Sequence, residues 1–106
     1  MTINKWLQTV KEGSYGCRPR LHCADGFSVS VQASAFHYCT PRVDNARKYN
    51  SVELGFPRMV DELIIDYAED DNYTNTVYGY VPVHIVDELI KKHGGIETNL
   101  LGEGLA

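Results

Sequence analysis

The sequence predicts a single α+β domain in which amphipathic helices pack against a small, at least partly antiparallel sheet. Three observations support this prediction: an apolar stripe of helical period at the N-terminus, strict alternation around an Asp-Gly pair, and a second half in which short strands precede helices. The 106 residues suit one domain, and 43% apolar with 23% charged residues is ordinary for a globular protein. We expect the order helix, strand, strand, loop, strand, helix, strand, helix, with about four strands and three helices.

The first element is an amphipathic helix. Its apolar residues follow the i, i+3, i+4, i+7 spacing of one helix face. These residues are Ile3, Trp6, Leu7 and Val10. Thr2 is a suitable N-cap and Gly13 a suitable residue to end the helix, so we predict a helix over residues 3–12.

A β-hairpin follows the helix. Residues 18–23 and 27–33 both alternate between apolar and polar positions, and Asp25-Gly26 lies between them. An Asp-Gly pair flanked by alternating residues is the strongest local hairpin signal. Because Ser28, Ser30 and Gln32 form one side of the second strand, we expect only its other side to be buried.

Residues 34–50 have neither a helical nor a strand period, and they contain Pro41, Asn45 and Asn50, which favour loops. A loop of this length is uncommon in a compact domain unless it has a function or orders against a partner. This segment is therefore the first place to look for a site.

The second half contains a short internal duplication. Residues 52–57 precede Val-Asp-Glu-Leu-Ile at 60–64, and residues 77–82 precede the same five letters at 86–90. Each copy predicts a strand, a Gly-aromatic turn, a proline and a helix. Gly94 and Gly95 predict a left-handed end to the last helix, and residues 97–106 are expected to form a mobile tail.

Charge and cysteine content limit the function classes. The net charge of −4, from ten basic and fourteen acidic residues, disfavours a general nucleic-acid binder and falls short of a DNA mimic. The sequence has no apolar leader and no run long enough to span a membrane. Three cysteines are an odd number, so we expect reduced thiols and a cytoplasmic location.

Metal and catalytic sets are weak. The candidate zinc ligands lack the paired spacing of a structural site. They are Cys17, His22, Cys23, His37 and Cys39. A nucleophile could be drawn from Cys39 with His37 and Asp44, but no element that activates the thiol is evident, and no phosphate-binding glycine loop is present. We therefore predict no metal, no cofactor and no enzymatic activity.

The stronger candidate site is a cluster of arginine, aromatic and amide side chains in and before the loop. Arginine can hold a phosphate or carboxylate by two hydrogen bonds, and an aromatic ring can stack on a base. The predicted ligand-binding residues are Arg18, Arg20, His37, Tyr38, Arg42, Asp44, Asn45 and Arg47. In the alternative interpretation, Phe36 and Tyr38 pack on the hairpin and Arg42 pairs with Asp44.

A second aromatic cluster lies near the end of the chain. Tyr78 and Tyr80, with Tyr73 nearby, could add to the ligand site. The alternative, which we favour, is that Tyr78 and Tyr80 belong to a cross-strand aromatic set.

Four segments carry a resemblance to a known group. They are residues 23–34, 37–42, 52–57 and 76–82. Over about residues 15–96 the chain resembles small hypothetical proteins encoded by phages and prophages of Firmicutes and gut bacteria. The resemblance implies a setting and no catalytic residues. Small phage accessory proteins often counter host defence by capping a defence protein or by sequestering a nucleotide immune signal.

Several functions remain open. The leading expectation is a non-enzymatic phage accessory protein that forms a homo-oligomer and sequesters a nucleotide-like immune signal in the cytoplasm of an infected or lysogenic host. The first alternative is a protein-protein inhibitor of a CRISPR effector or another defence complex, with an acidic set facing a basic channel. That set is Glu62, Asp66, Glu69, Asp70 and Asp71. A small Cys39-dependent enzyme and a virion or packaging component are further alternatives.

Overall fold

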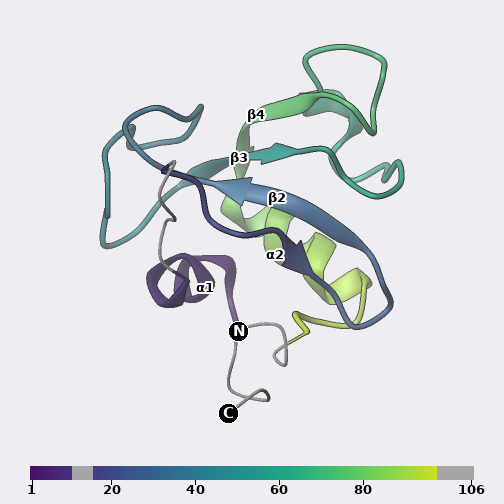
Figure 1. Ribbon diagram of the computed structural model, residues 1–106, viewed down its shortest axis with the longest axis horizontal. Coiled ribbons are helices and arrows are strands. Elements are labelled where there is room, and N and C mark those ends of the chain that lie inside the picture. Colours follow the sequence, from purple (N-terminus) through teal and green to yellow (C-terminus); the bar gives the residue numbers. More distant parts are fainter. Residues whose placement is uncertain (11–15, 98–106) are drawn as a thin grey trace.

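The computed structural model describes residues 1–10 and 16–97 and contains a four-stranded antiparallel sheet with two α-helices, so the α+β prediction is confirmed (Figure 1). The strands lie in the order β1-β2-β3-β4. The elements in chain order are α1 (Ile3–Thr9), β1 (Leu21–His22), β2 (Ser28–Gln32), β3 (Ser51–Gly55), the 3-10 turn η1 (Ile65–Tyr67), β4 (Val77–Pro82) and α2 (Val83–Lys92).

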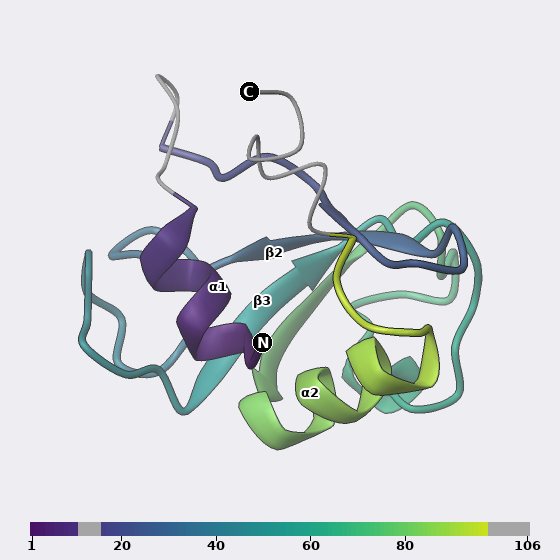
Figure 2. The same ribbon diagram turned by 90° about the horizontal axis from the view of Figure 1, so that it is seen from below.

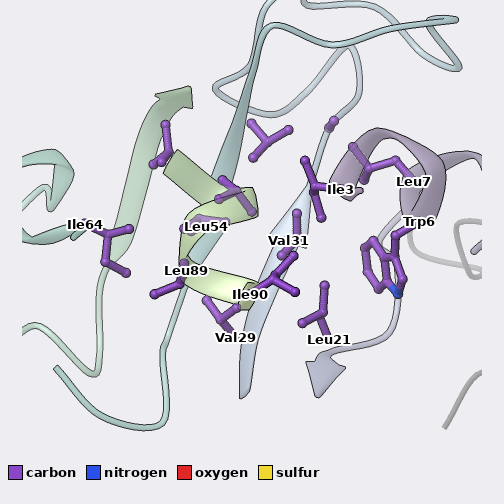
Figure 3. Packing of buried hydrophobic residues seen from close by; sticks show 14 of the residues in the cluster. Ile3, Trp6, Leu7, Leu21, Val29, Val31, Leu54, Ile64, Leu89 and Ile90 are labelled. Carbon is purple, nitrogen blue, oxygen red and sulfur yellow. The ribbon is translucent and has the colours of Figure 1, made fainter. Parts of the chain in front are cut away.

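Both helices cover the same face of the sheet (Figure 2). The core lies between the helices and the sheet. Leu89 and Ile90 of α2 pack over β2, and the Trp6 indole of α1 lies beside Leu21 (Figure 3). Trp6 is only 1% exposed, and Val31 and Leu54 are fully buried. No helix in the described ranges has the length and apolar character needed to cross a membrane.

Helix α1 begins as predicted but ends earlier. The Thr2 hydroxyl accepts a hydrogen bond from the Lys5 N–H, as an N-cap should, and Asp87 of α2 accepts from the Ile3 N–H at 2.7 Å. The helix stops at Thr9 because Val10 is extended (φ −96°, ψ 111°) and its carbonyl accepts from the Arg18 guanidinium. The predicted end at Gly13 lies outside the described residues.

The hairpin forms at Asp25-Gly26 with shorter strands than expected. Gly26 N–H donates to the Cys23 carbonyl, Cys23 N–H donates to the Phe27 carbonyl, and Gly26 has a φ of +96°. This is a type I turn followed by a left-handed glycine. Leu21 pairs with Val29 across the two strands.

The prediction that β2 buries only one side is wrong, because the chain before β1 covers its polar side. The Gln32 amide exchanges two hydrogen bonds with the Arg18 backbone, at 2.8 and 2.9 Å. The Arg20 guanidinium donates to the Ser28 hydroxyl at 2.9 Å. Ser28 and Gln32 are therefore each only 6% exposed.

The predicted helix at 60–64 does not form, so two α-helices are present in the described residues instead of three. The segment is a series of turns before η1. Asp61 is the reason: its carboxylate accepts from the Leu63 N–H and also from groups on α2, which fixes a turn. Ile64 is fully buried, whereas Val60 is 51% exposed. The same five letters form helix at 86–90, where Val86, Leu89 and Ile90 are all buried in the core.

Strand β4 continues through the position predicted to be a turn. Between Val52 and Leu54 of β3, the pairing with β4 shifts, so Gly79 and Tyr80 form a bulge. Tyr80 has a φ of +54°. The predicted left-handed end of α2 is confirmed at Gly94, which has a φ of +89°.

Irregular segments cover both outer strands. Ile96 pairs with Cys23 beside β1, and the Glu97 N–H donates to the His22 carbonyl at 2.8 Å. Ala68 pairs with Tyr78 along the outer side of β4. Apart from Glu97, the predicted mobile tail lies outside the described residues.

Candidate functional site

The segment predicted to be a loop, residues 34–50, is irregular in the structure and is held by internal hydrogen bonds. Tyr49, which is 2% exposed, is its anchor. The Tyr49 hydroxyl donates to the Val43 carbonyl at 2.7 Å, and the Asn4 amide on α1 exchanges two hydrogen bonds with the Tyr49 backbone. The loop is therefore a shaped surface attached to both α1 and the sheet.

The loop places Tyr38 and Arg42 beside Tyr80 of β4. We call these three residues the aromatic–arginine platform. The Tyr38 and Tyr80 ring centroids are 5.9 Å apart, with the planes tilted by 33°. The Arg42 guanidinium carbon lies 5.3 Å from the Tyr38 centroid, within cation–π range. Tyr38 is 39% exposed and Tyr80 50% exposed.

The backbone of the bulge forms the base of this platform. Tyr80 N–H donates to the Tyr38 carbonyl at 3.0 Å, and Tyr38 N–H donates to Glu53 Oε2 at 2.9 Å. Glu53 lies between the core residues Val52 and Leu54, so it points from the sheet face opposite the helices. A Cβ on Gly79 would lie 3.3 Å from Tyr38 Cβ, which explains why glycine suits that position.

Arg18 and Arg20, predicted to join the site, have other roles in the structure. Arg18 is 5% exposed, and its guanidinium donates to the carbonyls of Val10 and Ala33. The Arg20 guanidinium is bonded to Ser28 and to the Phe56 carbonyl. Partial burial lowers the pKa of Arg20. Both arginines hold the chain before β1 against the sheet, and neither belongs to the platform.

The other predicted residues of the loop are dispersed. In place of the alternative pairing of Arg42 with Asp44, Asp44 accepts from the Ala35 N–H at 2.9 Å and Arg42 lies over the Tyr38 ring. Asn45 has a φ of +54°. Asn45 and Arg47 line a separate pocket of about 250 Å³ between the loop and α1, together with Asn4 and Gln8.

His37 contacts a cysteine, but not the one expected. Its Nδ1 lies 2.6 Å from the Ser34 hydroxyl oxygen and its Nε2 lies 3.9 Å from the Cys17 sulfur. Cys39 is 2% exposed and its thiol donates to the carbonyls of Ser34 and Pro41. Burial raises the pKa of the Cys39 thiol, which does not suit a nucleophile. Among the described residues, no group of three or more His, Cys, Asp or Glu is placed to hold a metal ion.

Tyr78 is part of the core, contrary to its predicted pairing with Tyr80. It is fully buried, and its hydroxyl donates to the Tyr73 carbonyl at 2.6 Å. Burial raises the pKa of that phenol. The bulge separates the two rings, so only Tyr80 joins the exposed platform.

Sequence reasoning missed a charged cluster at the end of α2, in which His93 and Asp61 are buried and Asp25 and Lys92 are partly exposed. His93 Nδ1 lies 2.7 Å from Asp25 Oδ2, and His93 Nε2 lies 2.8 Å from Asp61 Oδ2. Lys92 also reaches Asp61, at 3.2 Å. Phe27 stacks on the imidazole with centroids 4.0 Å apart. A histidine in the last turn of a helix before two glycines was the available signal.

The contacts in the cluster shift the pKa values of His93, Asp25 and Asp61. Desolvation opposes protonation of His93, but its hydrogen bonds to Asp25 and Asp61 outweigh that effect and raise its pKa. The Phe27 N–H and then His93 lower the pKa of Asp25. Desolvation of Asp61 acts the other way, yet the Leu63 N–H, His93 and Lys92 lower its pKa. His93 therefore lies between two carboxylates, and its contacts tie the hairpin turn, the 61–64 turns and the end of α2 together.

Comparison with protein-family models, with curated proteins and with solved structures gives no match to this chain.

Proposed function

We propose that this chain is a non-enzymatic binding protein that engages a protein partner through the aromatic–arginine platform. The observation that carries the proposal is the grouping of Tyr38, Arg42 and Tyr80 as exposed side chains on a hydrogen-bonded base. Tyrosine and arginine are among the residues that contribute most to binding energy at protein interfaces. In the phage setting that the resemblance implies, the partner is a host defence complex in the bacterial cytoplasm.

The exposure of the platform favours a protein over a small molecule. Half of Tyr80 and more than a third of Tyr38 are open, and Phe36 in the same loop is 84% exposed. Small-molecule sites are concave and bury most of their ligand, whereas an exposed group of rings suits a broad partner surface.

The backbone at Tyr80 also supports a binding role. A non-glycine residue at a φ of +54° carries a conformational cost of about 1–2 kcal/mol. Because the Tyr80 ring is half exposed, its burial offsets little of this conformational cost. Strained residues cluster at functional sites, but Phe56 has a similar φ and a similar exposure, so the strain at Tyr80 supports a binding role only together with its contact with Tyr38.

Affinity capture from a defence-positive bacterial host, followed by quantitative mass spectrometry, tests the proposal. Wild type should recover a stoichiometric partner that Tyr80→Ala and Arg42→Ala lose. Phe56→Ala is the matched control, because Phe56 is 45% exposed and has a φ of +51°, but it has no part in the platform. Calorimetry with the purified partner should show a loss of roughly 30-fold or more for each platform variant. Equal recovery by all variants, or no partner, would refute the proposal.

A nucleotide-like signal is the second candidate, favoured by the position of Arg42 over Tyr38. A base could stack on Tyr80 while Arg42 holds a phosphate. It ranks second because Arg18 and Arg20 are occupied elsewhere, which leaves one arginine at the platform. Calorimetry with cyclic and linear nucleotides separates the two candidates. Nucleotide binding that Arg42→Ala abolishes would support the second candidate, and the absence of a binding signal with every nucleotide would exclude it.

A further inference from the structure

Cys17, His37 and Ser34 form a chain of contacts that runs from the exposed Cys17 thiol through the partly buried His37 to the buried Ser34. The Cys17 sulfur lies 3.9 Å from His37 Nε2, and His37 Nδ1 lies 2.6 Å from Ser34 Oγ. Ser34 is 1% exposed, and its oxygen also accepts from the Phe36 N–H, so its position is fixed. A thiol beside a base that a third group orients is the arrangement that activates nucleophilic cysteines.

The other two thiols of the chain have the opposite environment. Cys23 and Cys39 are 4% and 2% exposed, whereas Cys17 is exposed. Burial, with the Asp25 carboxylate nearby, raises the pKa of Cys23 to about 11. The Cys39 thiol is bonded to two carbonyls. Cys17 thus combines access to solvent with an adjacent imidazole.

We propose that Cys17 is a thiol-exchange site, activated by His37, that forms a mixed disulfide with a small-molecule disulfide of the glutathione type. Cys17 transfers its proton to His37 Nε2, and the thiolate attacks one sulfur of the disulfide. The new bond joins Cys17 to that sulfur and the original S–S bond breaks. The departing thiolate takes the proton from His37. Cys17 is oxidised, one half of the small disulfide is reduced, and a free thiol leaves.

Ser34 is the positioning residue of this site. With its hydroxyl 2.6 Å from Nδ1, it holds the imidazole so that Nε2 faces Cys17. In the thiolate–imidazolium state, Ser34 Oγ accepts from Nδ1–H while it keeps the hydrogen bond from Phe36. Loss of this hydroxyl should free the ring to turn away from the sulfur.

The test measures the rate at which the folded chain reacts with oxidised glutathione, as a function of pH, with the modified residue located by peptide mass spectrometry. We expect Cys17 to be the residue modified. Near pH 6.5, His37→Gln should slow the reaction about tenfold, and Ser34→Ala should slow it in the same direction. His84→Gln, which changes an exposed histidine of α2, is the matched control and should react like wild type.

Two controls keep the test independent of folding. Circular dichroism confirms that each variant is folded, and Cys17→Ser should abolish modification. In urea the wild-type and His37→Gln rates at Cys17 should become equal, because only the folded chain brings His37 to the sulfur. The same rate–pH profile for wild type and His37→Gln in the folded state would overturn the proposal. So would preferential modification of Cys23 or Cys39.

Discussion

The imidazole of His93 lies 2.8 Å from the carboxylate of Asp61, across a separation of 32 residues in the chain. This contact joins the end of α2 to the turns that replace a predicted helix. Asp25 holds the other ring nitrogen. Both side chains at this contact are buried, so the charge state of the imidazole should bear directly on the stability of the fold.

The charged cluster predicts a stability maximum on the weakly acidic side of neutrality. The folded pKa of His93 is raised above 6.5, so its contribution is complete below about that pH and is lost as the pH rises through the folded value. The pKa values of Asp25 and Asp61 are lowered below 3.8, so their contribution is lost only as the pH falls through those values. Urea denaturation at a series of pH values measures this dependence.

The variant His93→Gln separates the cluster from the rest of the titrating groups. Between about pH 6 and pH 9, its free energy of unfolding should fall less than that of wild type, because the variant has no imidazolium to lose. His84→Gln should keep the wild-type slope. Parallel curves for wild type and His93→Gln would contradict the assignment of a charged histidine.

The two glycines after α2 should differ in their response to alanine. Both have a φ near +90°, which costs an alanine roughly 1–2 kcal/mol. At Gly95 a Cβ meets nothing within 4 Å, whereas at Gly94 it would lie 3.2 Å from the Ala24 Cβ. We expect Gly94→Ala to lose about 1 kcal/mol more stability than Gly95→Ala in urea denaturation. Equal losses would mean that the hairpin turn can move away from α2.

The variant Tyr80→Gly should uncouple stability from binding. Glycine adopts a φ of +54° without strain, so relief of about 1 kcal/mol should offset the lost contact with Tyr38. The expected melting temperature is equal to or above that of wild type, while capture of the partner fails. Tyr80→Ala retains the strain and serves as the comparison. A large drop in the melting temperature of Tyr80→Gly would instead make the ring a clamp for the loop.

Arg18→Ala and Arg42→Ala should show opposite patterns. Arg18 is buried, and its removal leaves the carbonyls of Val10 and Ala33 without this donor, at about 1–3 kcal/mol for each unsatisfied group. Arg42 is exposed, and its removal should change stability by less than about 1 kcal/mol. Binding should respond to Arg42→Ala in the folded protein. Comparable unfolding energies for the two variants would show that Arg18 is dispensable to the fold.

Local patterns predicted most of the fold. The Thr2 cap, the Asp25-Gly26 turn and the glycine end of α2 depend on hydrogen bonds and backbone angles within a few residues, which sequence reports directly. The prediction of a helix at 60–64 is wrong because local sequence alone does not decide this segment. The same five letters are helical at 86–90, where α2 packs against the sheet. At 60–64 the conformation is set by the tertiary contacts of Asp61 and Ile64, and these contacts come from residues far along the chain.

The candidate site was predicted less well than the fold. Tyr38, Arg42 and Tyr80 are all candidates from composition, but the bulge that separates Tyr80 from Tyr78 and places it beside Tyr38 is not predicted by any short-range pattern. The sequence also does not distinguish a structural arginine from an exposed one. The Arg18 guanidinium donates to a buried carbonyl, whereas Arg42 is exposed to solvent. The sequence suggests Cys39, two residues away, as the cysteine beside His37, whereas in the structure the cysteine beside His37 is Cys17, twenty residues earlier.

The covering of β1 by Ile96 and of β4 by Ala68 limits how copies of this chain can assemble. Proteins with an open outer strand are prone to polymerise, because each new chain can add its backbone to the one before. Here the described part of β4 beyond Tyr78 is interrupted by the bulge at Tyr80 and ends at Pro82, which has no N–H to donate. In the described residues, both edges of the sheet are therefore poor templates for the addition of a further strand, which favours association of copies or partners through side chains.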